Sequence, residues 1–576
     1  MTPRKPHTKR RAMALAGTMG MLLIVLAILL LGALVTSSSQ GGLSGTGDSA
    51  LASARKRTDV QTALNLADSG SRLVLQWLGE GGMVSNPLTA KTPSQLGPGF
   101  FGATPSGGYD ILTVPQGGGA GNGTIKVRLY PYTSNAVQNR RLILVETVGD
   151  YSGAQQTIRM VLMESSFARY AYFSDRAPSN WWVAGNTRFN GPVHINGLDA
   201  AGTAVDPAAV VNILWKSGGA DQIFGYNGPG SFTTSLSASQ VHWHYNTNGN
   251  LWTPPDNSTW ASVLATGQAP EFGVPPVKMP LATTKQHDAA LGGTAEPTST
   301  GVSVPASGGT ATAGVFIKGD IDKLKLSAGG PDNTIQTMDI YQTDGATQLR
   351  TTVTIDPGSN TTTVLTQTNS GSSWVAGAPT SLSGIPNGAI YSSGHIHSLS
   401  GVVANNVMSG STVTEASDFT IATASDKDVK ITGGIVYANQ VSDAANPDNP
   451  LSNAAQPDEA SGTLGIVSRN VHLAETDDSG APLTDFSVHA TVMAFDTFGA
   501  DSPSTRPPGN FKLLGGYIAK NNGTFGVSSG TGDILTGLRV TRNFDARNVT
   551  NPPPFFPNEE NAFQVISYQR PGRPLE

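Results

Sequence analysis

The chain has 576 residues and a formal net charge of −5, and only 13% of its residues are charged, about half the usual share of a globular chain. Its 68 Gly and 37 Pro, with many Ser, Thr, Val and Ile, favour a β-rich body with many turns. Because the chain has no cysteine, disulfide scaffolds, thiol catalysis and Cys-ligated zinc or iron–sulfur sites are excluded. The length predicts roughly two to four domains.

Basic charge is concentrated at the N-terminus. The first eleven residues hold five Lys or Arg and no acid. Since the whole chain has a net charge of −5, the remaining residues together carry −10. A mildly acidic body argues against a nucleic-acid partner, because phosphate binding needs a basic surface.

Residues 12–35 are 24 consecutive uncharged residues around an apolar run. As a helix they would extend about 36 Å, enough to cross a bilayer core of about 30 Å with some tilt. The basic cluster before them predicts a cytoplasmic segment 1–11 and an extracytoplasmic body. A signal peptide cleaved near Val35-Thr36-Ser37 is the alternative, although its apolar region would be longer than the usual 7–15 or so residues.

A Gly/Ser-rich linker is predicted over residues 36–49. A one-faced helix is predicted over 50–79, because apolar residues recur there at spacings of three and four. These residues are Val60, Ala63, Leu64, Ala67, Val74, Trp77 and Leu78.

This N-terminal region resembles that of PilX-type minor pilins. The shared features are a basic start, an uninterrupted membrane helix, and a second helix with Ala67-Asp68-Ser69-Gly70, where members usually have Ala-Glu-Ala-Gly. The resemblance implies that the hydrophobic helix holds the subunit in the inner membrane and later packs in a filament core.

One feature of such pilins is not matched. Typical members are cleaved after a Gly and carry a Glu five residues into the mature chain. The candidate glycines Gly17 and Gly20 place Leu22 and Val25 at that position. The resemblance therefore leaves processing by a prepilin peptidase, and docking between subunits through this Glu, open.

Residues 80–123 are rich in Gly and Pro and are predicted to be a connection. Over 124–164 we predict a small antiparallel meander, because the runs 124–132, 141–148 and 155–163 alternate polar and apolar residues. A helix followed by such a meander is also the plan of a pilin head, which fits the resemblance.

The remaining residues, 165–576, are predicted to form a β-rich body. Short segments that begin with Gly and alternate apolar residues recur at irregular spacing, which favours a degenerate β-solenoid whose rungs tolerate insertions. A β-sandwich with long loops is the alternative. The segments begin at Gly191, Gly314, Gly388, Gly434, Gly465 and Gly516.

Pieces of this body resemble a bacterial domain family of unknown function that often follows PilX-like N-termini. The pieces are residues 189–197, 388–391, 464–467, 493–495 and 551–557. Because that family has no established activity, the resemblance implies a fold and a location rather than a mechanism.

Two residue patterns suggest ligands. The pairs His242/His244 and His395/His397 place two imidazoles on one strand face, a spacing that zinc can use and that ordinary strand faces also show. A cluster of tryptophans predicts either a surface that stacks on sugar rings or the core of one module. The cluster comprises Trp181, Trp182, Trp215, Trp243, Trp252 and Trp260.

Signals for catalysis are weak. The stretch from Gly526 to Gly530 matches a Gly-x-Ser-x-Gly nucleophile pattern, which requires a strand before it and a helix after it, but a turn and a strand pattern follow. Acidic stretches at 447–450 and 457–459 offer oxygen ligands for calcium, or are solvated loops. A polysaccharide-cleaving solenoid would need clustered carboxylates. We assign no catalytic, cofactor-binding or metal-binding residue.

The sequence thus predicts a minor-pilin-like, single-pass inner-membrane protein with an extracytoplasmic body. We expect a structural role in the assembly of a type IV pilus or a related surface filament, without enzyme activity or a cofactor. Expected partners are the inner membrane, other pilin-like subunits or assembly proteins, and a glycan surface. A glycan-binding adhesin is the alternative, followed by a polysaccharide-degrading enzyme.

Overall fold

The computed structural model describes residues 47–80, 90–97, 99–115, 122–132, 142–177, 181–183, 188–214, 231–244, 269–371, 373–410, 412–415, 417–439, 460–528 and 534–571. They are mainly β, with two α-helices, α2 (Gly47–Gly79) and α3 (Thr284–Leu291). The predicted segments 1–11 and 12–35 lie outside these residues. Neither described helix is long and apolar enough to span a membrane.

The chain divides into two compact units, which are described separately. Unit 1 comprises Met1–Thr133, Arg141–Met163 and Asn561–Glu576, and unit 2 comprises Ser134–Arg140 and Glu164–Glu560.

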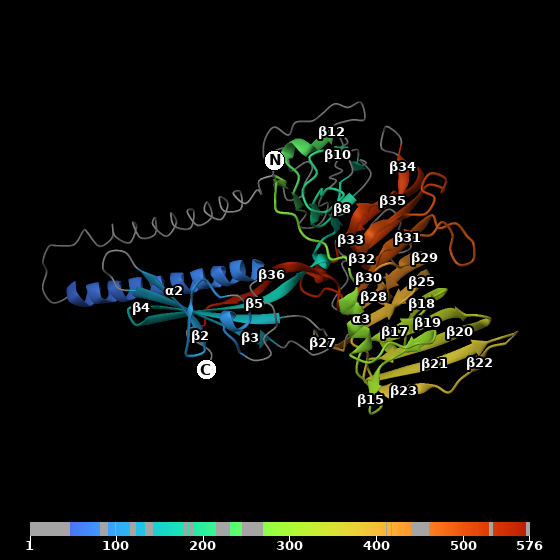
Figure 1. Ribbon diagram of the computed structural model, residues 1–576, viewed down its shortest axis with the longest axis horizontal. Coiled ribbons are helices and arrows are strands. Elements are labelled where there is room, and N and C mark those ends of the chain that lie inside the picture. Colours follow the sequence, from blue (N-terminus) through green and yellow to red (C-terminus); the bar gives the residue numbers. More distant parts are fainter. Residues whose placement is uncertain are drawn as a thin grey trace, which may run out of the picture. The chain divides into compact units, whose positions relative to one another are not determined.

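Unit 1 combines α2 with a six-stranded sheet in the order β1-β2-β3-β4-β5-β36 (Figure 1). The predicted meander is present as three antiparallel strands, β3, β4 and β5. Two further antiparallel strands, β1 and β2, lie inside the segment that we predicted to be a connection, where flanking glycines obscure a short alternating run. The bounds are β1 (Thr104–Ser106), β2 (Tyr109–Pro115), β3 (Asn122–Tyr132), β4 (Leu142–Tyr151), β5 (Ala154–Ser166) and β36 (Asn558–Gln569).

The C-terminal strand completes this sheet. We predicted that all residues after 164 belong to the body, but β36 lies next to β5 and most of its residues belong to unit 1. Pairing within a sheet joins segments from opposite ends of the chain, which a local pattern does not reveal. The Tyr568 hydroxyl also donates to Asp68 Oδ1 of α2 at 2.9 Å.

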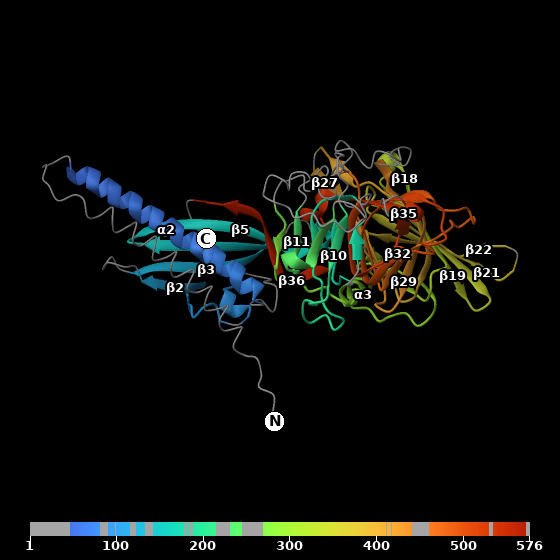
Figure 2. The same cartoon turned by 90° about the horizontal axis from the view of Figure 1, so that it is seen from above.

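Helix α2 lies along one face of the sheet (Figure 2). Its buried residues Ala67, Val74 and Trp77 share a core with apolar residues of β3, β4 and β5. The approach is close: a Cβ built on Gly149 of β4 would lie 1.9 Å from the Ala63 carbonyl oxygen. Small residues are therefore required where helix and sheet meet.

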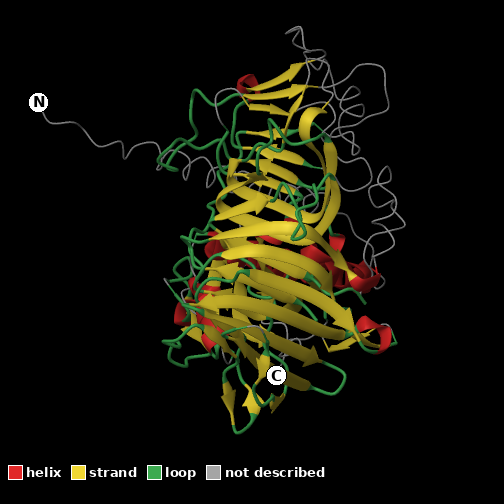
Figure 3. Ribbon diagram, turned by 90° about the vertical axis from the view of Figure 1, so that its right-hand side faces the viewer, coloured by secondary structure: helices red, strands yellow, loops and turns green. Residues whose placement is uncertain are grey.

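Unit 2 contains a long ladder of strands in which each neighbouring pair is parallel (Figure 3). Five of the six predicted Gly-started segments contribute a strand to this first ladder. Its spatial order is β17 (Val315–Lys318), β24 (Ala389–Ser392), β28 (Phe419–Thr423), β30 (Leu464–Ser468), β32 (Asp485–Ala500), β33 (Gly509–Asn522), β6 (Tyr172–Ser174), β9 (Val193–Ile195), β11 (Phe232–Thr234) and β13 (Glu271–Phe272).

The order in space is not the order in sequence. The chain enters the ladder at β6 and adds β9, β11 and β13 toward one end. It then resumes at the opposite end with β17 and returns strand by strand to β33, which pairs with β6. Segments far apart in sequence thus meet in the middle of one continuous ladder.

The long strands β32 and β33 also belong to a second ladder. The first residues of β33, Gly509–Leu514, pair with β35, whereas Tyr517–Ala519 pair with β6. Gly515, at φ +138°, makes the turn between the two, and a Cβ there would lie 2.3 Å from Ala490 O. This ladder runs β18 (Lys323–Gly329), β25 (Ile396–Val403), β29 (Asp428–Tyr437), β32, β33, β35 (Ile534–Asn543) and β8 (Arg188–Asn190), all parallel.

At one end of unit 2, β18 continues into antiparallel strands. The bounds are β19 (Ile335–Asp344), β20 (Thr347–Asp356), β21 (Thr361–Asn369), β22 (Val375–Ala376) and β23 (Thr380–Ser383). The smaller elements are β14 (Gly301–Ser303), β15 (Ala306–Ser307), β16 (Thr310–Ala311), β31 (Asn470–Leu473), β34 (Gly526–Ser528), a hairpin of β26 (Val407–Ser409) and β27 (Thr412–Glu415), and a parallel sheet of β7 (Trp181–Val183), β10 (Val211–Leu214) and β12 (Val241–His244).

The first ladder is buried on both sides. Residues of one side enter the main core, and those of the other side pack in a second cluster with α3 and the C-terminal strap, which we define as residues 544–557. The strap is held by hydrogen bonds from the Thr420 hydroxyl to Pro554 O (2.5 Å) and from the Gln286 amide to Phe555 O (2.6 Å). Gly465 lies beneath Phe556, where a Cβ would come within 2.7 Å of the ring.

Candidate functional site

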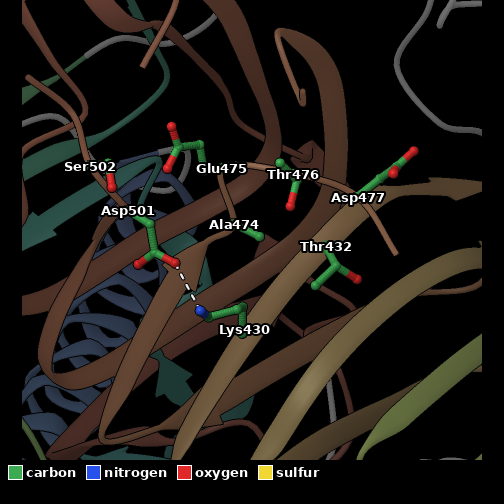
Figure 4. A pocket seen from close by; sticks show the side chains of 8 residues that line it. All are labelled: Lys430, Thr432, Ala474, Glu475, Thr476, Asp477, Asp501 and Ser502. Carbon is green, nitrogen blue, oxygen red and sulfur yellow. Dashed lines mark ion pairs between the residues drawn. The ribbon is translucent and has the colours of Figure 1, made fainter. Parts of the chain in front are cut away.

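A polar cleft of about 450 Å³ lies on unit 2 where three segments of the chain meet (Figure 4). One wall comes from β29, one from the loop after β31, and one from the end of β32. Its lining residues are Lys430, Thr432, Ala474, Glu475, Thr476, Asp477, Asp501 and Ser502.

The loop that borders the cleft is fixed from behind and from its tip. The fully buried Arg506 donates to Leu473 O at 3.3 Å and also to Leu483 O, so it holds both ends of the loop. At the tip, Asp478 contacts Lys323 Nζ at 2.6 Å and accepts from the Ser398 hydroxyl at 2.8 Å. The cleft is therefore preformed by contacts that reach across neighbouring rungs.

Most charges in the cleft are already paired. Lys430 Nζ lies 3.0 Å from Asp501 Oδ2, and His472 Nδ1 lies 3.3 Å from Asp501 Oδ1. Hydrogen bonds from the Ser479 hydroxyl and from the backbone N–H groups of Ala481 and Ser479 hold the pKa of Asp477 below its usual range. The cleft thus offers hydrogen bonds to a polar molecule, and no nucleophile is paired with a base among its lining residues.

The two predicted histidine pairs have different surroundings. The rings of His395 and His397 are stacked, with centroids 5.8 Å apart. His395 Nδ1 accepts from Asp428 N at 3.2 Å, and His397 lies 4.0 Å from Asp320 Oδ2. Within the described ranges, no three His, Asp or Glu side chains are arranged to hold a metal ion. His242 lies on β12 with its Nε2 3.1 Å from Ser239 O.

The tryptophan cluster is described only in part. Trp243 is buried and packs edge-on against Phe232, with ring centroids 6.2 Å apart, so it is a core residue. Trp181 and Trp182 lie on β7. Trp215, Trp252 and Trp260 lie outside the described residues.

The Gly-x-Ser-x-Gly match lacks the required context. Its first residues form β34, and β35 begins at Ile534 and pairs with it antiparallel. A nucleophile of this class needs a helix directly after the serine; residues 529–533 lie outside the described residues, and the next described element is the strand β35. The acidic stretches 447–450 and 457–459 lie outside the described residues.

A buried polar network occupies the motif at 189–197. The His194 ring bonds to the Thr233 hydroxyl at 2.7 Å and to Asn196 Oδ1 at 2.8 Å, and Asn196 donates to Asp175 at 2.8 Å. Burial lowers the pKa of His194 to about 4 and raises that of Asp175. Asn196 also donates to Val277 O and accepts from Val277 N, so this network connects the segment around Val277 to the first ladder.

No motif in the sequence predicted the cleft. Lys430, Glu475 and Asp501 stand on separate segments and belong to no motif. By contrast, residues of the pieces 388–391, 464–467, 493–495 and 551–557 meet in the cluster beneath the C-terminal strap. Those pieces therefore pack against one another in the core of unit 2.

Comparisons with known proteins found similarity among solved structures alone. No family model and no curated protein matches the chain. Among solved structures, the chain is similar to the competence-associated pilin ComZ from Thermus thermophilus, with 11% identity, a TM-score of 0.25, and coverage of 89% of this chain and 98% of that chain. A TM-score of 0.25 does not establish a shared fold.

Proposed function

We propose that this protein is a minor-pilin-like subunit that takes part in assembling a type IV pilus or a related surface filament. In this proposal, residues 12–35 anchor it in the inner membrane as a single pass, and unit 2 is extracytoplasmic. Its role is structural rather than catalytic, and its partners are other pilin-like subunits or assembly proteins.

The observation that carries the proposal is the contrast between the two halves of α2. From Leu51 to Gln61 no side chain of the helix is buried, whereas burial begins at Ala63 and continues to Leu78. Residues 51–61 form about 16 Å of helix that buries no side chain against the part of the chain that the structure describes. Isolated helical turns are marginal in water, so a partner for this half is expected.

The residues that carry the pilin resemblance support the same proposal. Ala67 is fully buried, and its carbonyl accepts from the Thr147 hydroxyl at 2.9 Å. A Cβ on Gly70 would lie 2.5 Å from the Ile125 side chain. The small residues of Ala67-Asp68-Ser69-Gly70 thus allow the helix to lie directly on the meander.

For unit 2, we propose that the parallel ladders form a degenerate β-solenoid. In this interpretation β32 and β33 each pass through more than one face of a rung, and Gly515 turns the chain between faces. The irregular spacing of the Gly-started segments then reflects insertions between rungs.

The test is intact-mass and N-terminal analysis of the native protein extracted from membranes. A start at Thr18 or Met21 would support prepilin-type processing and incorporation into a filament. An intact N-terminus in the membrane fraction would support a permanent anchor and an accessory role. A start near Ser38 in a soluble fraction would overturn the proposal.

A further inference from the structure

The strands β19–β22 form a sheet at one end of unit 2 (Figure 1). On β19 and β20 one face is buried and the other is partly exposed, whereas β22 and the adjoining end of β21 are exposed or half-buried on both faces. Met338, Ile340 and Val353 point into the main core. The alternate residues form an outward surface that we call the aromatic patch. It comprises Asp339, Tyr341, Arg350, Thr352, Gln367 and Trp374.

Two aromatic rings dominate this patch. Trp374 is 38% exposed, and its ring meets that of Tyr341 edge-on, with centroids 6.3 Å apart and an interplanar angle of 78°. The Arg350 guanidinium lies over the Tyr341 ring, 5.5 Å from its centroid. The rings are therefore held in place by neighbours instead of being free to collapse onto the sheet.

Ordered polar groups surround the rings. Asp339 Oδ1 accepts from Arg350 Nη2 at 3.0 Å and from the Thr352 hydroxyl at 2.7 Å, which fixes the carboxylate. Among the described residues, neither Asp339 Oδ2 nor the Gln367 amide has a hydrogen-bond partner. In register, Gln367 lies directly beside Arg350. The patch thus presents unused acceptors and donors next to an exposed ring.

We propose that the aromatic patch binds a neutral polysaccharide, with Trp374 and Tyr341 packing against sugar rings. Ring faces suit the C–H groups of a sugar, and the fixed carboxylate and amide suit its hydroxyls. Within the patch, Asp339 and Arg350 offset each other, and the exposed Lys325, which lies in register with Asp339 on β18, adds a single positive charge beside them. One lysine is not the basic cluster that an anionic polymer needs, which favours a neutral partner. The flanking threonines supply no apolar core of the kind that a stable protein interface needs.

The test uses the full-length protein and native affinity electrophoresis in gels that contain hydroxyethyl cellulose, dextran or laminarin, with alginate as an anionic polysaccharide. We expect at least one neutral polysaccharide to retard the wild type. Trp374→Ala should weaken this binding roughly tenfold or more, and Tyr341→Phe should retain it. The matched control is Val375→Ala, because Val375 is 64% exposed and lies next in sequence on the opposite face of its strand.

Three results would overturn the proposal. The first is that no neutral polysaccharide retards the protein. The second is that Trp374→Ala binds as tightly as the wild type and the Val375→Ala control, which would place the binding site elsewhere. The third is retardation by alginate alone that salt abolishes. Circular dichroism of each variant verifies that lost binding is not lost folding.

Discussion

Helix α2 and the first ladder of unit 2 differ in how fully they bury their side chains. Strands such as β28 and β30 are buried along their whole length, between the main core and the cluster under the C-terminal strap. Helix α2 buries one stripe of its C-terminal half and nothing between Leu51 and Gln61. The ladder is therefore complete within its own unit, whereas the first half of the helix is exposed among the described residues, and we propose that a partner subunit covers it.

The largest expected effect comes from breaking the ladder at its strap. Arg547 and Asp545 form a buried ion pair at 2.7 Å, and Arg547 also donates to the Gly462 carbonyl at 3.3 Å. Arg547→Ala leaves a buried carboxylate unpaired and should lower the free energy of unfolding of unit 2 by about 3–5 kcal/mol. Urea unfolding followed by circular dichroism measures this change.

The control for Arg547 is a comparable pair on the surface. Arg469 contacts Asp428 at 2.7 Å, but its side chain is 44% exposed. Arg469→Ala should cost less than about 1 kcal/mol. Equal effects of the two substitutions would contradict the idea that the strap is a buried fastening.

Acidification should lower the free energy of unfolding of unit 2, which contains two buried histidines. Burial lowers the pKa of His194 to about 4 and that of His489 to about 3, whereas both titrate near 6.5 in the unfolded chain. Their stabilisation is complete above pH 6.5 and is lost as the pH falls toward 4, by about 1.4 kcal/mol per pH unit for each histidine. Urea midpoints at pH 7.5, 6 and 5 measure the slope.

His489→Gln removes one of the two titrating imidazoles and should therefore roughly halve that slope. The fold should tolerate the change because the glutamine amide can still accept from Tyr437 N, which lies 3.1 Å from His489 Nδ1. A stability that does not change between pH 7 and 5 would show that these imidazoles are not buried in the neutral form.

A smaller effect is expected where α2 meets the sheet. A methyl group on Gly149 would collide with the backbone of Ala63 and Ala67, so Gly149→Ala should destabilise unit 1 by about 1–3 kcal/mol. Hydrogen exchange read by mass spectrometry separates β3–β5 from the ladder. Gly79→Ala is the control, because nothing lies within 4 Å of a Cβ there. If Gly149→Ala speeds exchange in the ladder more than in unit 1, then Gly149 does not act through the packing of α2 on the sheet.

The smallest effect on stability belongs to the exposed half of the helix. Val60 is 36% exposed, and Val60→Asp should change the free energy of unfolding by no more than about 0.5 kcal/mol. The same variant should abolish assembly if this half packs against other subunits. A filament-forming strain that carries Val60→Asp and still assembles normally would show that this half has no such partner.

Local patterns predicted the strands but not their arrangement. Alternating residues located β3, β4 and β5, and glycine-started runs located strands such as β17 and β30, because these signals depend on neighbours in sequence. The pairing of β33 with β6, the position of β36 and the cleft around Lys430 and Asp501 depend on contacts between residues far apart in sequence. The aromatic patch gave no signal either, because Tyr341 and Trp374 meet only across the strand register.

The most direct test of the central claim is photo-cross-linking in cells. The natural chain has no cysteine, so a benzophenone maleimide can be attached to one position at a time. We predict that Val60→Cys in the exposed half of α2 yields adducts with other membrane-anchored filament subunits. Leu281→Cys, at an exposed position of unit 2, should not yield them. The same adducts from both positions, or none from Val60→Cys, would contradict the account.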